Sequence, residues 1–308
     1  MQVLLTGASG AIGAALAPRL ADAGHAVRAF ARDPARVTAA GVAEVVRGDA
    51  LTGAGLHAAL RGAEVAYYLI HSMEAAGAAA GGFAERERAA VGAFARAARR
   101  AGVRRVVYLG GLVPATARPS PHLASRLAVE EVLLGAAPEA VALRASIVIG
   151  ATSRSFRFLV RLVERVPVMP LPAWRTHRTQ PIDVRDVLEY LLAAGTSDAV
   201  TGPVSLDVVG PDLVTYGELV DRIRDALLVA RPALRLPFSL TPVASVVAAA
   251  IAGEDPALIG PLMEGLEEDL LPRDDRARVL FGVRPHRLDA AIEHALARWE
   301  ASEALRAR

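Results

Sequence analysis

The chain has no cysteine and no lysine, almost no net charge, and no apolar run long enough to cross a bilayer. Without cysteine it has no disulfide, no thiolate metal ligand and no cysteine nucleophile. Its 35 basic residues, all of them arginine, nearly balance 33 acidic ones, so the net charge of +2 does not indicate nucleic-acid binding. The most apolar late stretch, from Leu240 to Ala252, contains Pro242 and is shorter than the roughly 20 residues that a membrane-spanning helix needs.

These absences narrow the class of protein. The first strand is predicted from residue 2, so no leader of the basic-then-apolar kind precedes it. We therefore expect a protein of the cytoplasm, monomeric or homodimeric, whose partner is a small-molecule substrate and which binds no nucleic acid, membrane or metal. With 308 residues, 53% of them hydrophobic, the chain can form one large domain or two.

A short apolar strand at the start of the chain leads directly into glycines spaced three apart, Gly7, Gly10 and Gly13. The first permits a tight turn, the second lets the backbone approach a pyrophosphate, and the third lets the next helix pack closely on the strand. The N–H groups and the dipole at that helix's N-terminus then favour phosphate. The pattern predicts a dinucleotide site rather than a glycine turn without a ligand. The residues predicted to contact the cofactor in this segment are Gly7, Ser9, Gly10, Ala11 and Ile12.

Short apolar segments alternate with helical ones over the first two thirds of the chain. This alternation predicts right-handed crossovers and an open parallel sheet with helices on both faces, an α/β fold whose ligands bind beyond the carboxyl ends of the strands. The predicted strands are Val3–Thr6, Val27–Ala31, Glu44–Arg47, Val65–Ile70, Arg105–Leu109 and Ala140–Ala145. The predicted helices between them are Ala11–Ala23, Pro34–Ala39, Gly53–Leu60, Phe83–Ala101 and Pro121–Leu134.

After Gly150 the alternation becomes irregular. Strands are predicted at Arg178–Ile182 and Val204–Val209, and helices at Arg154–Val166, from the capping box at Thr215 onward, near Pro242–Ala252 and Pro256–Leu270, and at Leu288–Ala301. We expect a nucleotide-binding domain over residues 1–210. A smaller, mainly helical substrate-binding unit is expected over 211–308, with residues 151–182 contributing to it.

Several segments together resemble the atypical and extended short-chain dehydrogenases/reductases. Residues 6–13 resemble the family's glycine motif, and residues 27–34, 66–73 and 108–112 resemble its atypical NAD(P)H-binding subgroup, which is near the NmrA-like regulators and the sugar-nucleotide epimerases. Residues 180–187 and 210–216 continue the match, so the resemblance covers essentially the whole chain. It implies a Rossmann doubly wound parallel sheet and a nicotinamide cofactor.

Two arginines beyond the second predicted strand favour NADP(H) over NAD(H). Sites selective for NAD place a carboxylate at the end of that strand, whereas here Arg32 follows it and Arg36 comes one helical turn later. A guanidinium pairs well with a 2′-phosphate through two parallel hydrogen bonds. The alternative is that Arg32 is a solvated loop residue and Asp33 only caps the helix that Pro34 begins.

The remaining predicted cofactor contacts follow the third to sixth strands. By the resemblance, Asp49 takes the position that accepts a hydrogen bond from the adenine amino group; the alternative is an ordinary turn aspartate. The end of the fourth strand is expected to pass beneath the adenosine ribose and the pyrophosphate. The predicted contacts in these segments are Asp49, Ala50, Leu69, Ile70, His71, Gly110, Gly111 and Ser146.

The catalytic position departs from the family pattern. The resemblance implies a Ser or Thr after the fifth strand and then Tyr-x-x-x-Lys, but Gly110 and Gly111 occupy the first position and His122 and Arg126 the second. A neutral His122 in the first turn of a helix can polarise a carbonyl, and Arg126 can bind a ribose or a substrate anion but cannot relay a proton. The alternative is that His122 is a surface residue and Arg126 pairs with Glu130.

Substrate contacts are predicted in two further places. Ser72 and Met73 belong to an Ala/Gly-rich stretch that forms either a lid or a plain surface loop. Trp174 and Arg178 either bind an aromatic or anionic substrate or are used in packing and in contact with water. In contrast, the tyrosine pair at 67 and 68 is predicted to be buried strand packing.

Two hypotheses of different classes follow. The first is an NADPH-dependent reductase or dehydrogenase acting on a small carbonyl-bearing or conjugated substrate, in which the cofactor carries the hydride. The second is a redox sensor that binds NADP(H) without turnover, which the missing Tyr and Lys favour. Sugar-nucleotide epimerisation is a weaker third, because that chemistry normally requires the missing tyrosine.

Overall fold

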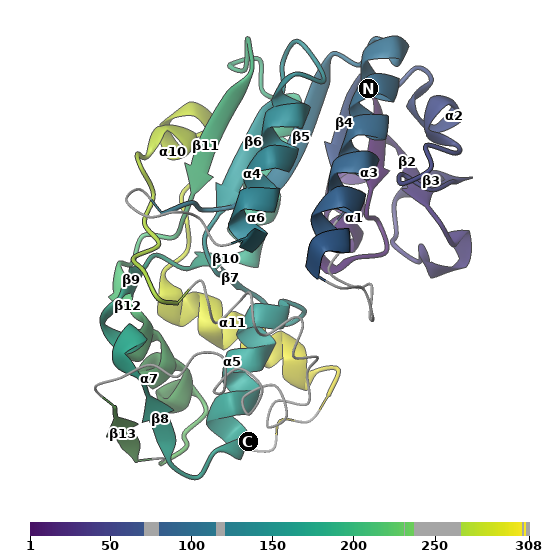
Figure 1. Cartoon of the computed structure of the whole chain (residues 1–308). Helices are drawn as coiled ribbons and strands as arrows, with labels where there is room; N and C mark the ends of the chain where they lie inside the picture. Colours follow the sequence, from purple (N-terminus) through teal and green to yellow (C-terminus); the bar gives the residue numbers. More distant parts are fainter. Residues whose placement is uncertain (71–79, 115–120, 231, 237–265, 304, 306–308) are drawn as a thin grey trace.

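Seven parallel strands form one sheet in the order β11-β6-β5-β4-β1-β2-β3 (Figure 1). The structure is a computed structural model that describes all residues except 71–79, 115–120, 231, 237–265, 304 and 306–308. The strand order reverses beside β1, so the predicted doubly wound α/β sheet is confirmed. The strands are β1 (Gln2–Thr6), β2 (Ala26–Ala31), β3 (Val42–Arg47), β4 (Val65–Tyr68), β5 (Arg105–Gly111), β6 (Val141–Ala145) and β11 (Val204–Val208).

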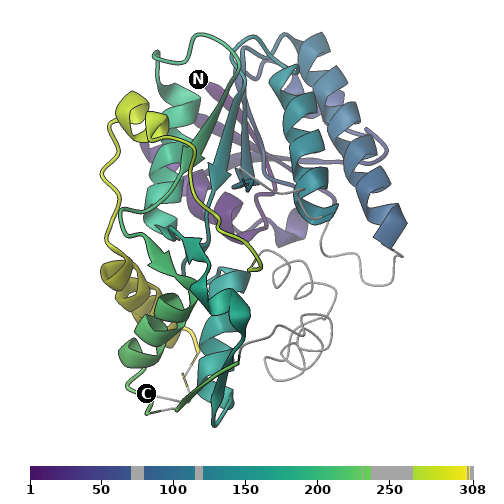
Figure 2. The same ribbon diagram turned by 60° about the vertical axis from the view of Figure 1, so that its left-hand side comes forward.

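Helices cover both faces of this sheet. On one face lie α1 (Ala11–Asp22) and α6 (Val184–Thr196), whose apolar residues share a core with Leu5 and Val107. On the other lie α2 (Leu56–Leu60), α3 (Ala80–Ala101) and α4 (Pro121–Leu134), packed on Leu4 and Val106. Figure 2 shows α3 and α4 side by side on that second face. The central strands are therefore buried on both sides, as their continuous apolar sequence requires.

The neighbouring tyrosines of β4 show the strand alternation directly. The hydroxyl of Tyr67 donates to the carbonyl of Leu191 in α6, with 3.1 Å between the oxygens. The ring of Tyr68 packs on the opposite face, with its centroid 4.9 Å from that of Phe94 in α3. Both are buried, so their predicted role as strand packing is confirmed.

A second core lies below the sheet in Figure 1 and joins three helices, α5 (Arg154–Arg165), α7 (Tyr216–Ala226) and α11 (Leu288–Glu300). The predicted capping box at Thr215 is present: its hydroxyl accepts from the N–H of Glu218 and its own N–H donates to the Glu218 carboxylate. Close to the end of the chain, α10 (Arg276–Phe281) packs back on β11 and α6. Short elements complete the unit: β7 (Val148–Ile149), β8 (Met169–Leu171), η3 (Ala173–Thr176), β9 (Arg178–Thr179), β10 (Ile182–Asp183), β12 (Val214–Thr215) and β13 (Ala233–Arg235).

Some predicted elements differ from those observed. The helix predicted at Pro34–Ala39 is a single 3-10 turn, η1 (Pro34–Arg36), and α3 begins at Ala80. The strand predicted at 178–182 is split into β9 and β10, because Pro181 between them has no N–H for a ladder. Residues 266–270 are not helical, and the rest of the helix predicted to end there lies outside the described residues, as does the helix predicted near 242–252. None of the described helices combines the length and the apolarity needed to cross a membrane.

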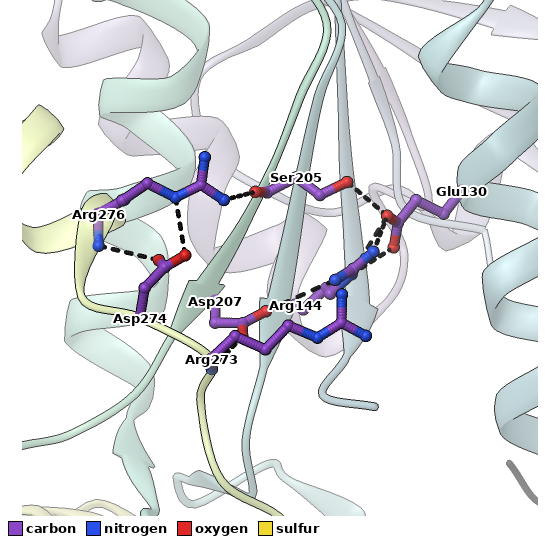
Figure 3. Close-up of polar contacts among 7 residues, drawn as sticks. All are labelled: Glu130, Arg144, Ser205, Asp207, Arg273, Asp274 and Arg276. Carbon is purple, nitrogen blue, oxygen red and sulfur yellow. Dashed lines mark hydrogen bonds and ion pairs between the residues drawn. The ribbon is translucent and has the colours of Figure 1, made fainter. Parts of the chain in front are cut away.

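A charged cluster fastens α4 and the segment before α10 to the β11 edge of the sheet (Figure 3). Arg144 of β6 donates two hydrogen bonds to the separate oxygens of Glu130 in α4, at 2.6 and 2.9 Å. Ser205 donates to the same carboxylate, while Asp207 accepts from the backbone N–H of Arg273 at 2.7 Å. Glu130 thus pairs with Arg144 and Ser205 of the sheet.

Candidate active site

A cavity of about 1020 Å³ lies at the carboxyl ends of the parallel strands, between the sheet and the second core. Its walls come from the segments after β1 to β6, from α3 and α4, and from α5 on the side of the second core. All of the predicted cofactor-contacting residues except His71 line it, and His71 lies outside the described residues. The lining residues among them are Gly7, Ser9, Gly10, Ala11, Ile12, Arg32, Arg36, Asp49, Ala50, Leu69, Ile70, Gly110, Gly111 and Ser146.

The glycine turn after β1 leaves no room for side chains. Gly7 has φ +70°, which glycine adopts without strain, and a Cβ there would lie 2.5 Å from the carbonyl oxygen of Leu69. A Cβ at Gly13 would collide with the carbonyl oxygen of Gly7. The turn is closed by the N–H of Gly10, which donates to that same oxygen at 2.9 Å. Bare backbone therefore faces the cavity here.

The N-terminus of α1 opens onto this bare backbone. Its N-cap is Gly10, which has no side chain to satisfy the first N–H groups of the helix. Ala11 and Ile12, the first helical residues, line the cavity. Open N–H groups at the positive end of a helix dipole, with no Cβ in the way, fit the diphosphate of a dinucleotide.

The part of the cavity formed by the segments after β2 and β3 has two arginines and two aspartates. Arg32 and Arg36 are exposed, and neither side chain bonds to any residue that the structure describes. Asp33 accepts from the N–H of Ala35 at 3.1 Å and so caps η1, as the alternative interpretation of this segment had it. Asp49 accepts from the N–H of Leu51 at 2.9 Å, so it has the turn role while also lining the cavity.

Arg126, one of the two predicted catalytic residues, lines the cavity from α4. The hydroxyl of buried Tyr108 in β5 donates to the backbone carbonyl of Arg126 at 3.5 Å. Burial raises the pKa of Tyr108, whereas the nearby Arg126 guanidinium acts to lower it. The other predicted catalytic residue, His122, belongs to the first turn of α4, and its side chain lies outside the described residues.

The predicted substrate contacts at Trp174 and Arg178 do not line the cavity. Trp174 is 6% exposed and packs in the second core, its ring edge-on to that of Tyr216. Arg178 forms an ion pair with Asp269 at 2.6 Å. A large aromatic ring is as useful for packing as for binding, which explains the difference. Ser72 and Met73 lie outside the described residues.

The structure adds lining residues that sequence reasoning missed. Arg86 of α3 lines the cavity, and so do four apolar residues, Phe158 and Leu159 of α5 together with Leu266 and Leu270. These residues come from segments far apart in the chain, and none belongs to a local motif. Helical periodicity alone cannot say which face of α3 or α5 meets a cavity.

Three hydroxyls meet at the inner end of the cavity. The oxygens of Ser146 and Thr179 are 3.2 Å apart, and Thr179 in turn hydrogen-bonds the side chain of Tyr216. Burial raises the pKa of Tyr216, and the Thr179 bond only partly opposes this. Since Ser146 and Tyr216 both line the cavity, the group can present a hydroxyl donor there.

Comparison with known proteins agrees with the geometry. A family model described as NAD(P)H-binding matches residues 7–146. Over 238 residues the chain is 32% identical to a ceramide reductase of Caulobacter vibrioides, covering 76% of this chain and 73% of that protein. It is 30% identical over 148 residues to NADH dehydrogenase [ubiquinone] 1 alpha subcomplex subunit 9 of Arabidopsis thaliana, covering 48% of this chain but only 36% of that protein.

The fold recurs in solved structures of sugar-nucleotide enzymes. MoeE5, in complex with UDP-glucose and NAD, superposes with a TM-score of 0.72 at 20% sequence identity, covering 98% of this chain and 99% of that one. At this identity the likeness concerns the fold alone.

Proposed function

Because the chain belongs to the atypical short-chain dehydrogenase/reductase family, we propose that it is an NADP(H)-dependent oxidoreductase that reduces a carbonyl or conjugated substrate without the usual Tyr–Lys pair. The observation that carries this proposal is the single cavity in which the glycine turn, Arg32 and the ends of β4 to β6 come together. The bound cofactor would supply the hydride. The protein would bind, orient and polarise the substrate.

The choice of NADP(H) rests on Arg32 and Arg36. Both line the adenosine end of the cavity, and no described residue competes for either guanidinium. Asp33, a carboxylate of the kind that an NAD site uses, caps η1 with one oxygen. A 2′-phosphate placed between two guanidiniums gains charge-assisted hydrogen bonds that NAD(H) cannot form.

The substrate end of the cavity supports an apolar substrate. Phe158, Leu159, Leu266 and Leu270 line it, and one relative of the chain is named a ceramide reductase. An alkyl-bearing carbonyl compound is therefore the substrate class we propose to test first. Ser146, Arg126 and His122 are the residues proposed to donate hydrogen bonds to the substrate oxygen or to the cofactor ribose.

The test begins with calorimetric titration of the purified protein with NADPH and NADH. We expect NADPH to bind at least about tenfold more tightly, a difference of about 1.4 kcal/mol. In Arg32→Ala this preference should largely disappear, whereas the control Arg61→Ala, an exposed arginine outside the cavity, should keep it. Equal affinity of Arg32→Ala and wild type for NADPH would refute the assignment.

Turnover is tested by the loss of NADPH absorbance with ketones, enones and quinones of increasing alkyl length. If NADPH is oxidised in the presence of one class of compound, at a rate that rises with alkyl length, the reductase is supported. A second candidate, a sensor that binds NADP(H) without turnover, is favoured by the lack of lysine and by the burial of all five tyrosines. Saturable NADPH binding with no turnover of any compound in the panel would favour that sensor.

A further inference from the structure

Two arginines from neighbouring helices line the cavity. Arg86 is in α3 and Arg126 in α4, and the two helices stand side by side in Figure 2. A hydrogen bond joins the helices there, from the hydroxyl of Ser125 to the carboxylate of Glu87, at 2.7 Å. Since each arginine is the immediate sequence neighbour of one of these bonded residues, both are anchored at the same level of the helix pair.

Arg86 has no partner of its own in the described part of the chain. Its side chain is half-buried and makes no hydrogen bond or ion pair with any described residue. The carboxylate of the adjacent Glu87 is buried, at 5% exposed, and accepts a hydrogen bond from Ser125. A guanidinium taken partly out of water without a partner is costly, so its position at a cavity wall indicates an anionic ligand.

The charged residues that line the cavity also favour an anionic ligand. The carboxylates among the described lining residues are Asp33 and Asp49, both at the adenosine end and both used in their own turns. Toward the other end the charged lining residues are arginines only, Arg86, Arg126 and Arg154. The apolar side chains of Phe158 and Leu159 in α5 line the same cavity.

From this arrangement, and resting on the proposed function, we infer that Arg86 and Arg126 form an anion-binding subsite for the substrate. It would hold a carboxylate or phosphate head group, while the apolar part of the substrate lies against Phe158 and Leu159. Two guanidiniums suit such a group because each offers paired N–H donors to its oxygens. Within the alkyl-bearing carbonyl compounds proposed above, this subsite selects those that carry an anionic head group.

The test uses decanoate, decyl phosphate and decanol below their micellar concentrations, titrated calorimetrically into the protein saturated with NADP+. We expect both anions to bind wild type at least about tenfold more tightly than decanol. Arg86→Gln should reduce this preference to about threefold or less. The control Arg88→Gln, an exposed arginine on the same helix that does not line the cavity, should leave it unchanged.

Three outcomes overturn the inference. The first is equal affinity for decanol and the anions in wild type. The second is an unchanged preference for the anions over decanol in Arg86→Gln. The third is a weakened NADPH affinity in Arg86→Gln with anion binding intact, which would assign Arg86 to the cofactor. Binding of one anion only would identify the head group and support the subsite. The same titrations on the protein without cofactor test the subsite even if NADP+ does not bind, so a failure of the proposed function is distinguished from a failure of the subsite.

Discussion

Ser125 of α4 donates a 2.7 Å hydrogen bond to Glu87 of α3, and this bond is buried between the two helices, with exposures of 9% and 5%. It joins the two helices at the level of the cavity-lining residues Arg86 and Arg126. We expect Ser125→Ala to lower the free energy of unfolding by about 1–3 kcal/mol, because a buried carboxyl oxygen is left without its donor. Urea denaturation measures this difference.

The matched control is Ala124→Ser, an exposed change one residue away on the same helix. It should change stability by less than about 0.5 kcal/mol. Because Arg86 and Arg126 flank the bonded pair, Ser125→Ala should also weaken decanoate binding. Unchanged stability in Ser125→Ala would show that the bond does not hold the helices together.

A second prediction concerns the close approach of α1 to the glycine turn. In Gly13→Ala the new Cβ would collide with the carbonyl oxygen of Gly7, so the helix must shift away from the turn. We expect the NADPH dissociation constant to rise at least about tenfold and the free energy of unfolding to fall by about 1–3 kcal/mol. Calorimetry and urea denaturation measure the two effects.

Gly202→Ala provides the comparison, since a Cβ at Gly202 meets only open space. It should bind NADPH like wild type. If Gly13→Ala also binds NADPH like wild type, the phosphates do not lie at the N-terminus of α1.

These two predictions differ in how far the sequence alone could have led to them. The glycine turn is a local pattern: strand, turn and helix are contiguous, and each glycine has its own steric reason, so the site could be predicted residue by residue. The contact of Ser125 with Glu87 joins residues of two helices. Nothing in the spacing of either helix indicates that those two side chains face each other.

The residues that line the cavity likewise depend on contacts between segments far apart in the sequence. Arg86 and Arg88 are two residues apart on α3, and only the packing of α3 on α4 determines that Arg86 lines the cavity while Arg88 is exposed. Trp174, in a proline-rich segment beside arginines, suggested a binding site, but its ring fills the second core. Composition identifies residues able to bind ligands, whereas long-range packing decides which of them do.

A third prediction tests the role of Arg178. Its guanidinium hydrogen-bonds Asp269, and this side-chain bond holds the pKa of Asp269 below its ordinary value. A carboxyl group whose pKa is lowered in the folded state contributes stability above its unfolded pKa of about 4 and loses it as the pH falls through the folded value. Arg178→Ala should therefore lower Tm slightly at neutral pH, and the difference should vanish in acid.

The effect should be small because both side chains are more than a third exposed and water screens the pair. Scanning calorimetry of wild type and Arg178→Ala across the acid range measures it. NADPH binding and turnover should be unchanged, since Arg178 does not line the cavity. A Tm difference that is the same at all pH values, or a loss of turnover, would contradict this role.

The last prediction concerns the five tyrosines. The family's Tyr-x-x-x-Lys pattern, absent from this chain, includes a tyrosine that transfers a proton. All five are buried, and burial raises the pKa of each; for Tyr190 it rises to about 12. In the unfolded chain they ionise near pH 10, so above that pH the unfolded state binds fewer protons than the folded one. Stability should therefore fall as the pH rises above about 10.

Phenolate absorbance gives the direct measurement. The folded protein should show less phenolate than the unfolded protein near pH 10, because burial raises the pKa of all five groups, whereas the protein unfolded in guanidinium chloride should titrate all five near pH 10. Tyr190→Phe, which removes a tyrosine that does not line the cavity, should leave turnover unchanged and lower the final phenolate absorbance by one group. A tyrosine that ionises in the folded protein below its ordinary pKa would instead reveal an activated phenol, and that tyrosine rather than His122 or Ser146 would then be assigned the proton transfer.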